Sequence, residues 1–133
     1  YKEENLYTPQ INTKSSEIAQ LSEIRKIVSN VLQFIFSNSK TGLVVEGRDM
    51  GSVVFKNADL KIYLDASETT RSERRIAQSD NKESVEDIRA RDSRDINRKI
   101  SPLIIPDDAI VINNENKSID EVIEIIKENL KLQ

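Results

Sequence analysis

The sequence predicts an α/β fold in which a parallel sheet is flanked by helices. Three short segments are almost continuously apolar, as are strands that are buried on both faces of a sheet. Longer stretches with helical periodicity separate them, and this alternation is typical of parallel sheets. The length of 133 residues matches one compact domain, so we expect a single hydrophobic core.

The N-terminal third is expected to hold one helix and one strand. Apolar side chains recur every three or four positions over about residues 15–37, which predicts a long amphipathic helix after a polar lead-in around Thr8 and Pro9. The apolar run Leu43–Val45 predicts a buried strand that leads into the glycine-containing segment 46–51.

The middle of the chain is expected to form a strand and two helices. Residues 60–64 are mostly apolar and predict the second strand, and residues 70–76 have the composition of a helix. Ser84 and Asp87 have the spacing of a capping box. We therefore expect a further helix to begin at Ser84 and to end near Ile100, ahead of the next proline.

The C-terminal part is expected to form a strand, a turn and a helix. Residues 109–112 are apolar and predict the third strand, and the asparagine-rich segment 113–116 predicts a turn. Ser118 and Glu121 have the spacing of a second capping box, which predicts a helix that continues toward the end of the chain.

Ligands of parallel sheets bind beyond the carboxyl ends of the strands, which here are segments 46–51, 65–67 and 113–114. In the first of these, Gly42 and Gly47 match half of a phosphate-binding loop, but Arg48 and Asp49 follow where Lys and Ser or Thr are required. We expect no phosphate loop of that class. Arg48 and Asp49 belong either to a strand-end turn that presents them to a ligand or to a turn with a surface ion pair.

Composition excludes several kinds of chemistry. The chain contains no cysteine, histidine or tryptophan, which excludes disulfides, thiolate zinc sites and imidazole catalysis. The net charge of −3 argues against a globally basic nucleic-acid-binding protein. The sequence lacks an apolar run long enough for a membrane span and the layout of a secretory signal, so we expect a cytoplasmic protein.

The arginines are concentrated in one region. Seven of the nine lie between residues 71 and 98. Guanidinium groups make planar, paired contacts with phosphate and carboxylate groups, so this clustering indicates an anionic ligand. On a helix, Arg91, Asp95 and Arg98 would form one stripe, opposite an apolar face of Val85, Ile88, Ile96 and Ile100. We expect the apolar face to pack and the charged stripe to be presented; the alternative is a solvated helix with exposed ion pairs.

Short strings in a fixed order resemble bacterial cytidylate kinases. They are residues 47–55, 58–67, 71–75, 91–98 and 101–103. The upstream stretch Thr8 to Arg25 is similar to the family's monophosphate-binding segment. This resemblance implies a P-loop NTPase fold of the nucleoside-monophosphate kinase type and transfer of the γ-phosphoryl group of ATP to CMP or dCMP, assisted by Mg²⁺.

The resemblance also implies roles for individual residues. The residues that match those recognising the cytosine ring are Ser16, Arg25 and Asp49. Those around the ribose and phosphate of CMP are Arg91, Asp95 and Arg98, with Arg48 on the acceptor phosphate. The lid arginines that close over ATP are Arg71, Arg74 and Arg75. The residues implied in catalysis are Arg48, Arg75, Arg91 and Arg98.

The family's glycine-rich phosphate loop has no counterpart in this sequence. The resemblance therefore implies a C-terminal portion that is incomplete at the N-terminus, contributes no metal ligand and is inactive alone, while the full-length enzyme is a monomer. The implied division is a partial kinase domain over 1–133: part of the monophosphate-binding region in 1–35, core in 36–70 and 101–133, and lid with arginine-rich helix in 71–100. The segment between Arg75 and Arg91 is shorter than is usual in the family.

Two other functions stay open from the sequence. One is a related kinase that acts on another nucleoside monophosphate or small molecule. The other is a non-catalytic module whose arginine-rich region binds RNA or another polyanion. The acidic net charge and the lack of stacking aromatic residues near the arginines count against the second, so the expected partners are CMP or dCMP and ATP, without nucleic acid or membrane.

Overall fold

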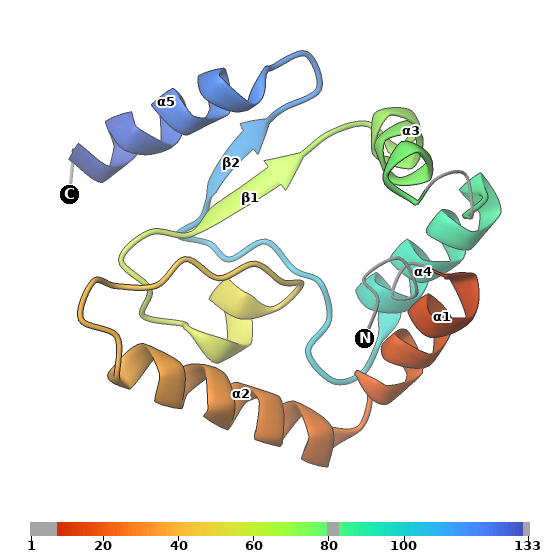
Figure 1. Cartoon of the computed structure of the whole chain (residues 1–133), viewed down its shortest axis with the longest axis horizontal. Coiled ribbons are helices and arrows are strands. Elements are labelled where there is room, and N and C mark those ends of the chain that lie inside the picture. Colours follow the sequence, from red (N-terminus) through yellow and green to blue (C-terminus); the bar gives the residue numbers. More distant parts are fainter. Residues whose placement is uncertain (1–7, 80–82, 132–133) are drawn as a thin grey trace.

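In a computed structural model of the chain, which describes residues 8–79 and 83–131, helices surround a small parallel sheet (Figure 1). A π-helical turn, Met50–Val54, precedes the sheet. The helices and strands in chain order are α1 (Pro9–Ile18), α2 (Ser22–Ser37), β1 (Ile62–Asp65), α3 (Glu68–Gln78), α4 (Val85–Asn97), β2 (Ile110–Asn113) and α5 (Ile119–Lys131). None of the helices in this described part is long and apolar enough to cross a membrane.

Two of the three expected strands form the sheet. β1 and β2 are parallel and aligned from Ile62 beside Ile110 to Asp65 beside Asn113. The backbone N–H of Ile110 donates to the carbonyl of Lys61 at 2.9 Å, which extends the pairing by one position. The expected strands at 60–64 and 109–112 are therefore confirmed with small shifts, and both point their carboxyl ends toward the side of α3 (Figure 1).

The expectation of a strand at Leu43–Val45 was wrong. This segment has no strand partner among the described residues, and Val44 is completely exposed. A strand forms only where its backbone N–H and C=O groups meet those of a neighbour. The expectation of helices covering both faces of the sheet also fails for the described part, because Leu64 and Val111 are each 52% exposed.

The single helix expected over residues 15–37 is two helices. α1 begins earlier because the Thr8 side chain accepts a hydrogen bond from the Ile11 backbone N–H at 3.3 Å and Pro9 occupies a first-turn position, where proline is tolerated. The chain leaves the helix after Ala19, and Leu21 is extended, with φ −81° and ψ 119°. The break contains neither glycine nor proline, and the apolar periodicity continues across it, which is why a single helix was expected.

Both expected capping boxes are confirmed. In α4 the Ser84 N–H donates to Asp87 at 3.0 Å while the Asp87 N–H donates to Ser84 Oγ at 3.1 Å. Ser118 and Glu121 make the equivalent pair before α5. α4 ends sooner than expected, at Asn97, because the next residue turns into an extended conformation with φ −66° and ψ 142°.

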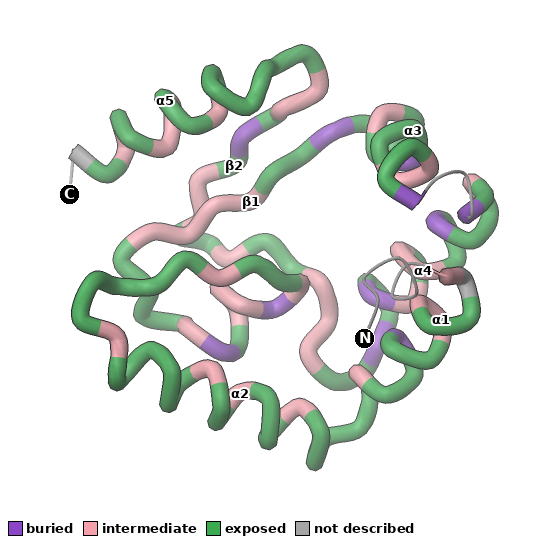
Figure 2. The backbone as a smooth tube through the Cα atoms, in the orientation of Figure 1, coloured by how far each residue is buried: buried purple, intermediate pink, exposed green. Residues whose placement is uncertain are grey.

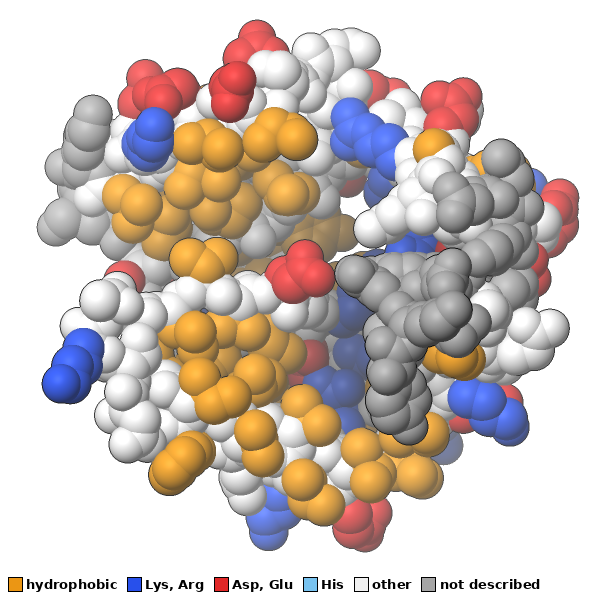
Figure 3. All heavy atoms as spheres, in the orientation of Figure 1, with side chains coloured by type: hydrophobic (Ala, Val, Ile, Leu, Met, Phe, Trp, Pro, Cys, Tyr) orange, Lys and Arg blue, Asp and Glu red, His pale blue; other side chains and the backbone are white. Residues whose placement is uncertain are grey.

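The expected single hydrophobic core does not form within the described residues. Four apolar side chains are buried (Val54, Ala66, Ile88 and Ile112), against seven polar or charged ones (Ser16, Asp49, Ser72, Ser79, Glu83, Asp95 and Arg98). Figure 2 shows that the buried positions are scattered through the fold, and α2 has none. Figure 3 shows hydrophobic side chains gathered on the surface over α2 and α5.

Replacing the α4 cap with Ser84→Ala is expected to lower the free energy of unfolding by about 1 kcal/mol, because a helix N–H loses its acceptor. Urea unfolding measures the change, and Ser93→Ala, at an exposed interior position of α4, is the control. The Ser84 N–H lowers the pKa of Asp87. The stabilisation by this carboxylate is thus present above the ordinary aspartate range and is lost as the pH falls through the lowered value. Equal losses in both variants would contradict the assignment.

Candidate functional site

Asp49 lies at the centre of the site and is buried. Its side chain is 3% exposed and forms an ion pair with Arg25 of α2. Arg25 also donates to the carbonyl of Ala19 at 3.3 Å, at the end of α1. The turn before Asp49 needs glycine, because a Cβ on Gly47 would lie 2.9 Å from Cγ of Met50. Asp49 therefore ties α2, and through Arg25 the end of α1, to this turn. The alternative of a surface ion pair is wrong for Asp49, because its ion pair is buried and is made with Arg25; that the turn presents Arg48 and Asp49 to a ligand stays a prediction.

Asp95 is the second buried carboxylate. It lies in α4, is 5% exposed, and pairs with Nε of Arg48 at 3.2 Å and with Nη1 of Arg98 at 3.6 Å. Burial and the positive charge of Arg25 lower the pKa of Arg98. Nη2 of Arg98 is buried without a hydrogen-bond partner in the described part of the chain. A buried guanidinium donor without an acceptor is suited to an anionic or carbonyl oxygen of a ligand.

α4 does not divide into the apolar and charged faces that its sequence predicts, because Ile88 and Asp95, seven residues apart on one face, are both buried. Asp95 and Arg98, at one end of the charged stripe, are buried, whereas Ile96 is 55% and Ile100 is 39% exposed. Ile88 is the buried apolar residue of the helix. The charged groups are inside because each meets a partner of opposite charge, which offsets the cost of removing it from water. The alternative of a solvated helix is therefore wrong for this stripe.

Asp92 joins the site to α3. It accepts a hydrogen bond from Nη2 of Arg48 at 3.3 Å and forms an ion pair with Arg71. The hydrogen bond to Asp92 raises the pKa of Arg71. Sequence reasoning did not single out Asp92, which is one of several acidic residues interleaved with arginines. Its position directly after Arg91 was the one feature that could have indicated a role at the site.

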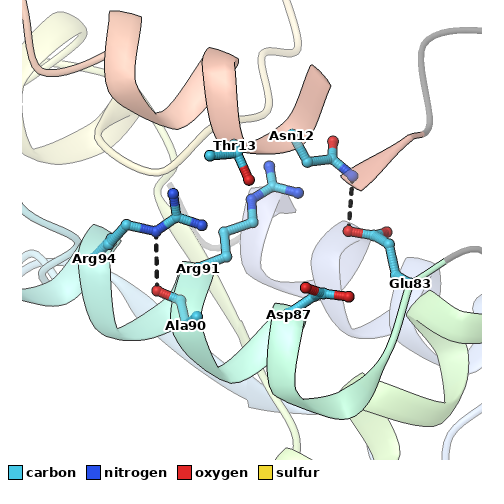
Figure 4. Close-up of a pocket in the computed structure, with 7 residues that line it drawn as sticks. All are labelled: Asn12, Thr13, Glu83, Asp87, Ala90, Arg91 and Arg94. Atoms are coloured by element: carbon cyan, nitrogen blue, oxygen red, sulfur yellow. Dashed lines mark hydrogen bonds between the residues drawn. The ribbon is translucent and has the colours of Figure 1, made fainter. Parts of the chain in front are cut away.

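Arg91 lines two cavities. The larger, about 270 Å³, lies between α1 and α4, and Figure 4 shows Arg91 extending across it from α4 toward α1. The smaller, about 180 Å³, is also lined by Arg48, Arg71 and Arg75. Burial lowers the pKa of Arg91, and the positive charges of Arg48 and Arg75 lower it further. The smaller cavity thus gathers four guanidinium groups, a setting that favours phosphate oxygens.

The three arginines that the resemblance assigns to a lid do not lie together. Arg74 donates to the side-chain oxygen of Asn114 at 3.0 Å and to the carbonyl of Glu115 at 3.2 Å, beyond the carboxyl end of β2. Arg71 instead pairs with Asp92 in the middle of α4, and Arg75 pairs with Glu83 just before α4 begins; both line the smaller cavity. The three residues are therefore divided between two places.

Glu83 and Asn12 form a contact that sequence reasoning missed. The Glu83 side chain is 2% exposed and accepts from Nε of Arg75 at 2.6 Å. Nδ2 of Asn12, in α1, donates to the other Glu83 oxygen at 2.7 Å (Figure 4). Ser16 lies one turn further along α1 and is also buried. No signal in the sequence pairs residues as distant as Asn12 and Glu83.

This arrangement suits a polar, anionic ligand. Buried carboxylates accept hydrogen bonds from amino and hydroxyl groups, and clustered guanidinium groups bind phosphate oxygens. Within the described ranges, no group of three or more acidic residues is suited to a metal ion.

Comparison with known proteins identifies relatives. The family model "Cytidylate kinase" matches residues 2–132. The chain is 38% identical over 123 residues to a cytidylate kinase of Pasteurella multocida, covering 87% of this chain and 53% of that protein. It is 43% identical over 128 residues to one of Mycoplasmoides gallisepticum, covering 91% and 56%. A bifunctional pantoate ligase/cytidylate kinase of Prochlorococcus marinus is 39% identical over 128 residues, covering 90% and 24%.

The match runs along nearly the whole chain but only part of each relative. The chain spans about half the length of the first of these relatives, 53%. The strings that carried the resemblance, the buried Asp49 and Asp95 and the arginines around them all fall inside the matched range of 2–132. The chain belongs to the cytidylate kinase family.

Proposed function

We propose that the chain forms the acceptor-nucleotide site of an enzyme that transfers the γ-phosphoryl group of ATP to CMP or dCMP. The observation that carries this proposal is the pair of buried carboxylates: Asp49 is held by Arg25 of α2, and Asp95 is held by Arg48 of the 47–49 turn and by Arg98 at the end of α4. Membership of the family supports the choice of substrates.

The cytosine ring is assigned to the end of the site at Asp49. Cytosine carries an amino group beside acceptor atoms, so a carboxylate can accept from the amino group while Arg25 donates to the ring. Ser16, buried in the neighbouring helix, is a further donor in this proposal. Because Asp49 is already fixed by Arg25, little ordering is needed when the ring binds.

The ribose and phosphate are assigned to α4 and the 47–49 turn. Asp95 accepts a hydrogen bond from a sugar hydroxyl in this proposal, and the buried, unpaired Nη2 of Arg98 donates to the ligand. Arg48 and Arg91 face the acceptor phosphate, since both line the smaller cavity. Phosphoryl transfer depends mainly on alignment and on stabilising the transferring oxygens, and these arginines supply the positive charge.

Arg71, Arg74 and Arg75 are proposed to contact the phosphates of ATP. Arg71 and Arg75 are the better supported, because they line the same cavity as Arg91. Mg²⁺ would enter bound to ATP, where it neutralises phosphate charge. We assign no residue of this chain to the metal. The lid role of residues 71–100 stays a proposal.

We further propose that the chain adopts the P-loop nucleoside-monophosphate kinase fold in part and is inactive alone. The exposed apolar side chains of α2 and of the sheet support this, since such faces are normally covered by a second layer. The coverage of 53% of a relative supports it independently.

CMP is expected to bind the chain at least tenfold better than UMP or AMP, and Asp49→Ala is expected to remove this preference because the cytosine amino group loses its buried acceptor. Titration calorimetry with the three nucleotides measures it. Asp59→Ala, at an exposed position, is the matched control. Unchanged discrimination in Asp49→Ala would remove Asp49 from this role.

The purified 133-residue chain is expected not to convert ATP and CMP to ADP and CDP, because no glycine-rich loop aligns the γ-phosphate. A coupled assay for ADP, with chromatographic detection of CDP, measures the activity. Consumption of ATP that disappears in an Arg91→Ala variant would show that the chain is active and would contradict this expectation.

A further inference from the structure

We infer that Glu83 is a positioning residue. Its buried carboxylate holds the Arg75 guanidinium until the phosphate oxygens of a ligand replace that carboxylate. This inference rests on the proposed function, which assigns Arg75 to the phosphates of ATP. The geometry carries it in three respects: the burial of the Glu83 carboxylate, the elements that it joins, and its place between two cavities.

The Glu83 carboxylate is held from two sides. One oxygen accepts from Nε of Arg75 in α3 at 2.6 Å, and the other accepts from Nδ2 of Asn12 in α1 at 2.7 Å. The Glu83 backbone N–H donates to Ser79 Oγ at 3.3 Å. With its side chain 2% exposed, Glu83 joins α1 and α3 just before the cap of α4.

Glu83 also lines both cavities, as Arg91 does. The smaller cavity holds four guanidinium groups, and its lining includes two carboxylates, those of Glu83 and Asp92. Glu83 therefore supplies a fixed negative charge where the proposed function requires the negative charge of a phosphate chain. Figure 4 shows its carboxylate facing Asn12 across the edge of the larger cavity.

A carboxylate and a phosphate group compete for the same guanidinium N–H groups. The Arg75 side chain is 22% exposed, so a ligand in the smaller cavity can reach it from solvent while Glu83 remains inside. A ligand that takes the Nε–H of Arg75 must replace the ion pair with Glu83. The ion pair consequently lowers the affinity for polyphosphate, and the ligand in turn weakens the link between α1 and α3.

The test is titration calorimetry with inorganic tripolyphosphate on the 133-residue chain and its Glu83→Gln variant. Glutamine keeps the volume and the acceptor for Asn12 but removes the charge that holds Arg75. We expect tripolyphosphate to bind Glu83→Gln about fivefold more tightly, as for a modest coupling between sites. Glu86→Gln, which removes the same charge at an exposed position three residues along, is expected to leave the affinity unchanged.

A double variant separates this role from a structural one. In an Arg75→Gln background, Glu83→Gln is expected to give no gain, because the guanidinium that it releases is absent. Asn12→Ala removes a hydrogen bond to the Glu83 carboxylate and an acceptor of Nη2 of Arg75 at 3.4 Å, but it keeps the charge of Glu83, and it is expected to give a smaller gain in the same direction. If Glu83→Gln does not fold, Asn12→Ala replaces it in the titration. Equal or weaker binding by the single variants, binding by none of the proteins, or a gain that persists without Arg75 would overturn the inference.

Failure of this inference can be told apart from failure of the proposed function. The preference for CMP over UMP depends on Asp49 and is expected to be the same in Glu83→Gln and in the parent chain. A parent chain that binds CMP and UMP equally would contradict the proposed function, whereas the tripolyphosphate titrations would still decide the role of Glu83.

Discussion

Two carboxylates removed from water, Asp49 and Asp95, determine how the segments around the site are arranged. Each is paired with arginine from another segment: Asp49 with Arg25 of α2, and Asp95 with Arg48 of the turn and Arg98 beyond α4. Removing one partner of a buried ion pair leaves an uncompensated charge, which costs about 3–5 kcal/mol. The segments therefore cannot shift independently, and the groups proposed to bind a nucleotide are in place before it arrives.

The same constraint explains why most of the buried residues in the described structure are polar or charged, while many large apolar side chains are exposed. Ion pairs and hydrogen bonds fix α1, α3 and α4 around the cavities, while the apolar side chains of α2 and α5 remain on the surface (Figure 3). One aromatic contact, between Phe36 and Phe55 with ring centres 5.8 Å apart, packs α2 against the π-helical turn. Specific polar contacts thus position the site, and the apolar faces of α2 and α5 are exposed.

Local signals predicted much of the fold. Capping boxes at Ser84 and Ser118 identified the starts of α4 and α5, and apolar runs identified β1 and β2, because these features depend on near neighbours. The failures depend on distant partners. Leu43–Val45 lacks a paired strand, and the break after α1 is stabilised by Arg25, which donates to Ala19. The inward face of α4 could not be predicted from hydrophobicity, since buried ion pairs with residues far along the chain outweigh it. The resemblance supplied the main site residues, Asp49, Asp95 and the arginines, whereas Asn12 and Glu83 became visible only in three dimensions.

Arginine side-chain NMR tests the preformed site most directly. In the chain without ligand, the Nε–H of Arg98 donates to the Ser101 carbonyl, and Nε of Arg48 forms an ion pair with Asp95 at 3.2 Å. The two groups are predicted to give separate signals that move when CMP is added, and the Arg98 signal is predicted to exchange slowly with water. Overlapping, rapidly exchanging signals like those of free arginine, unchanged by CMP, would contradict a site held in place by buried ion pairs.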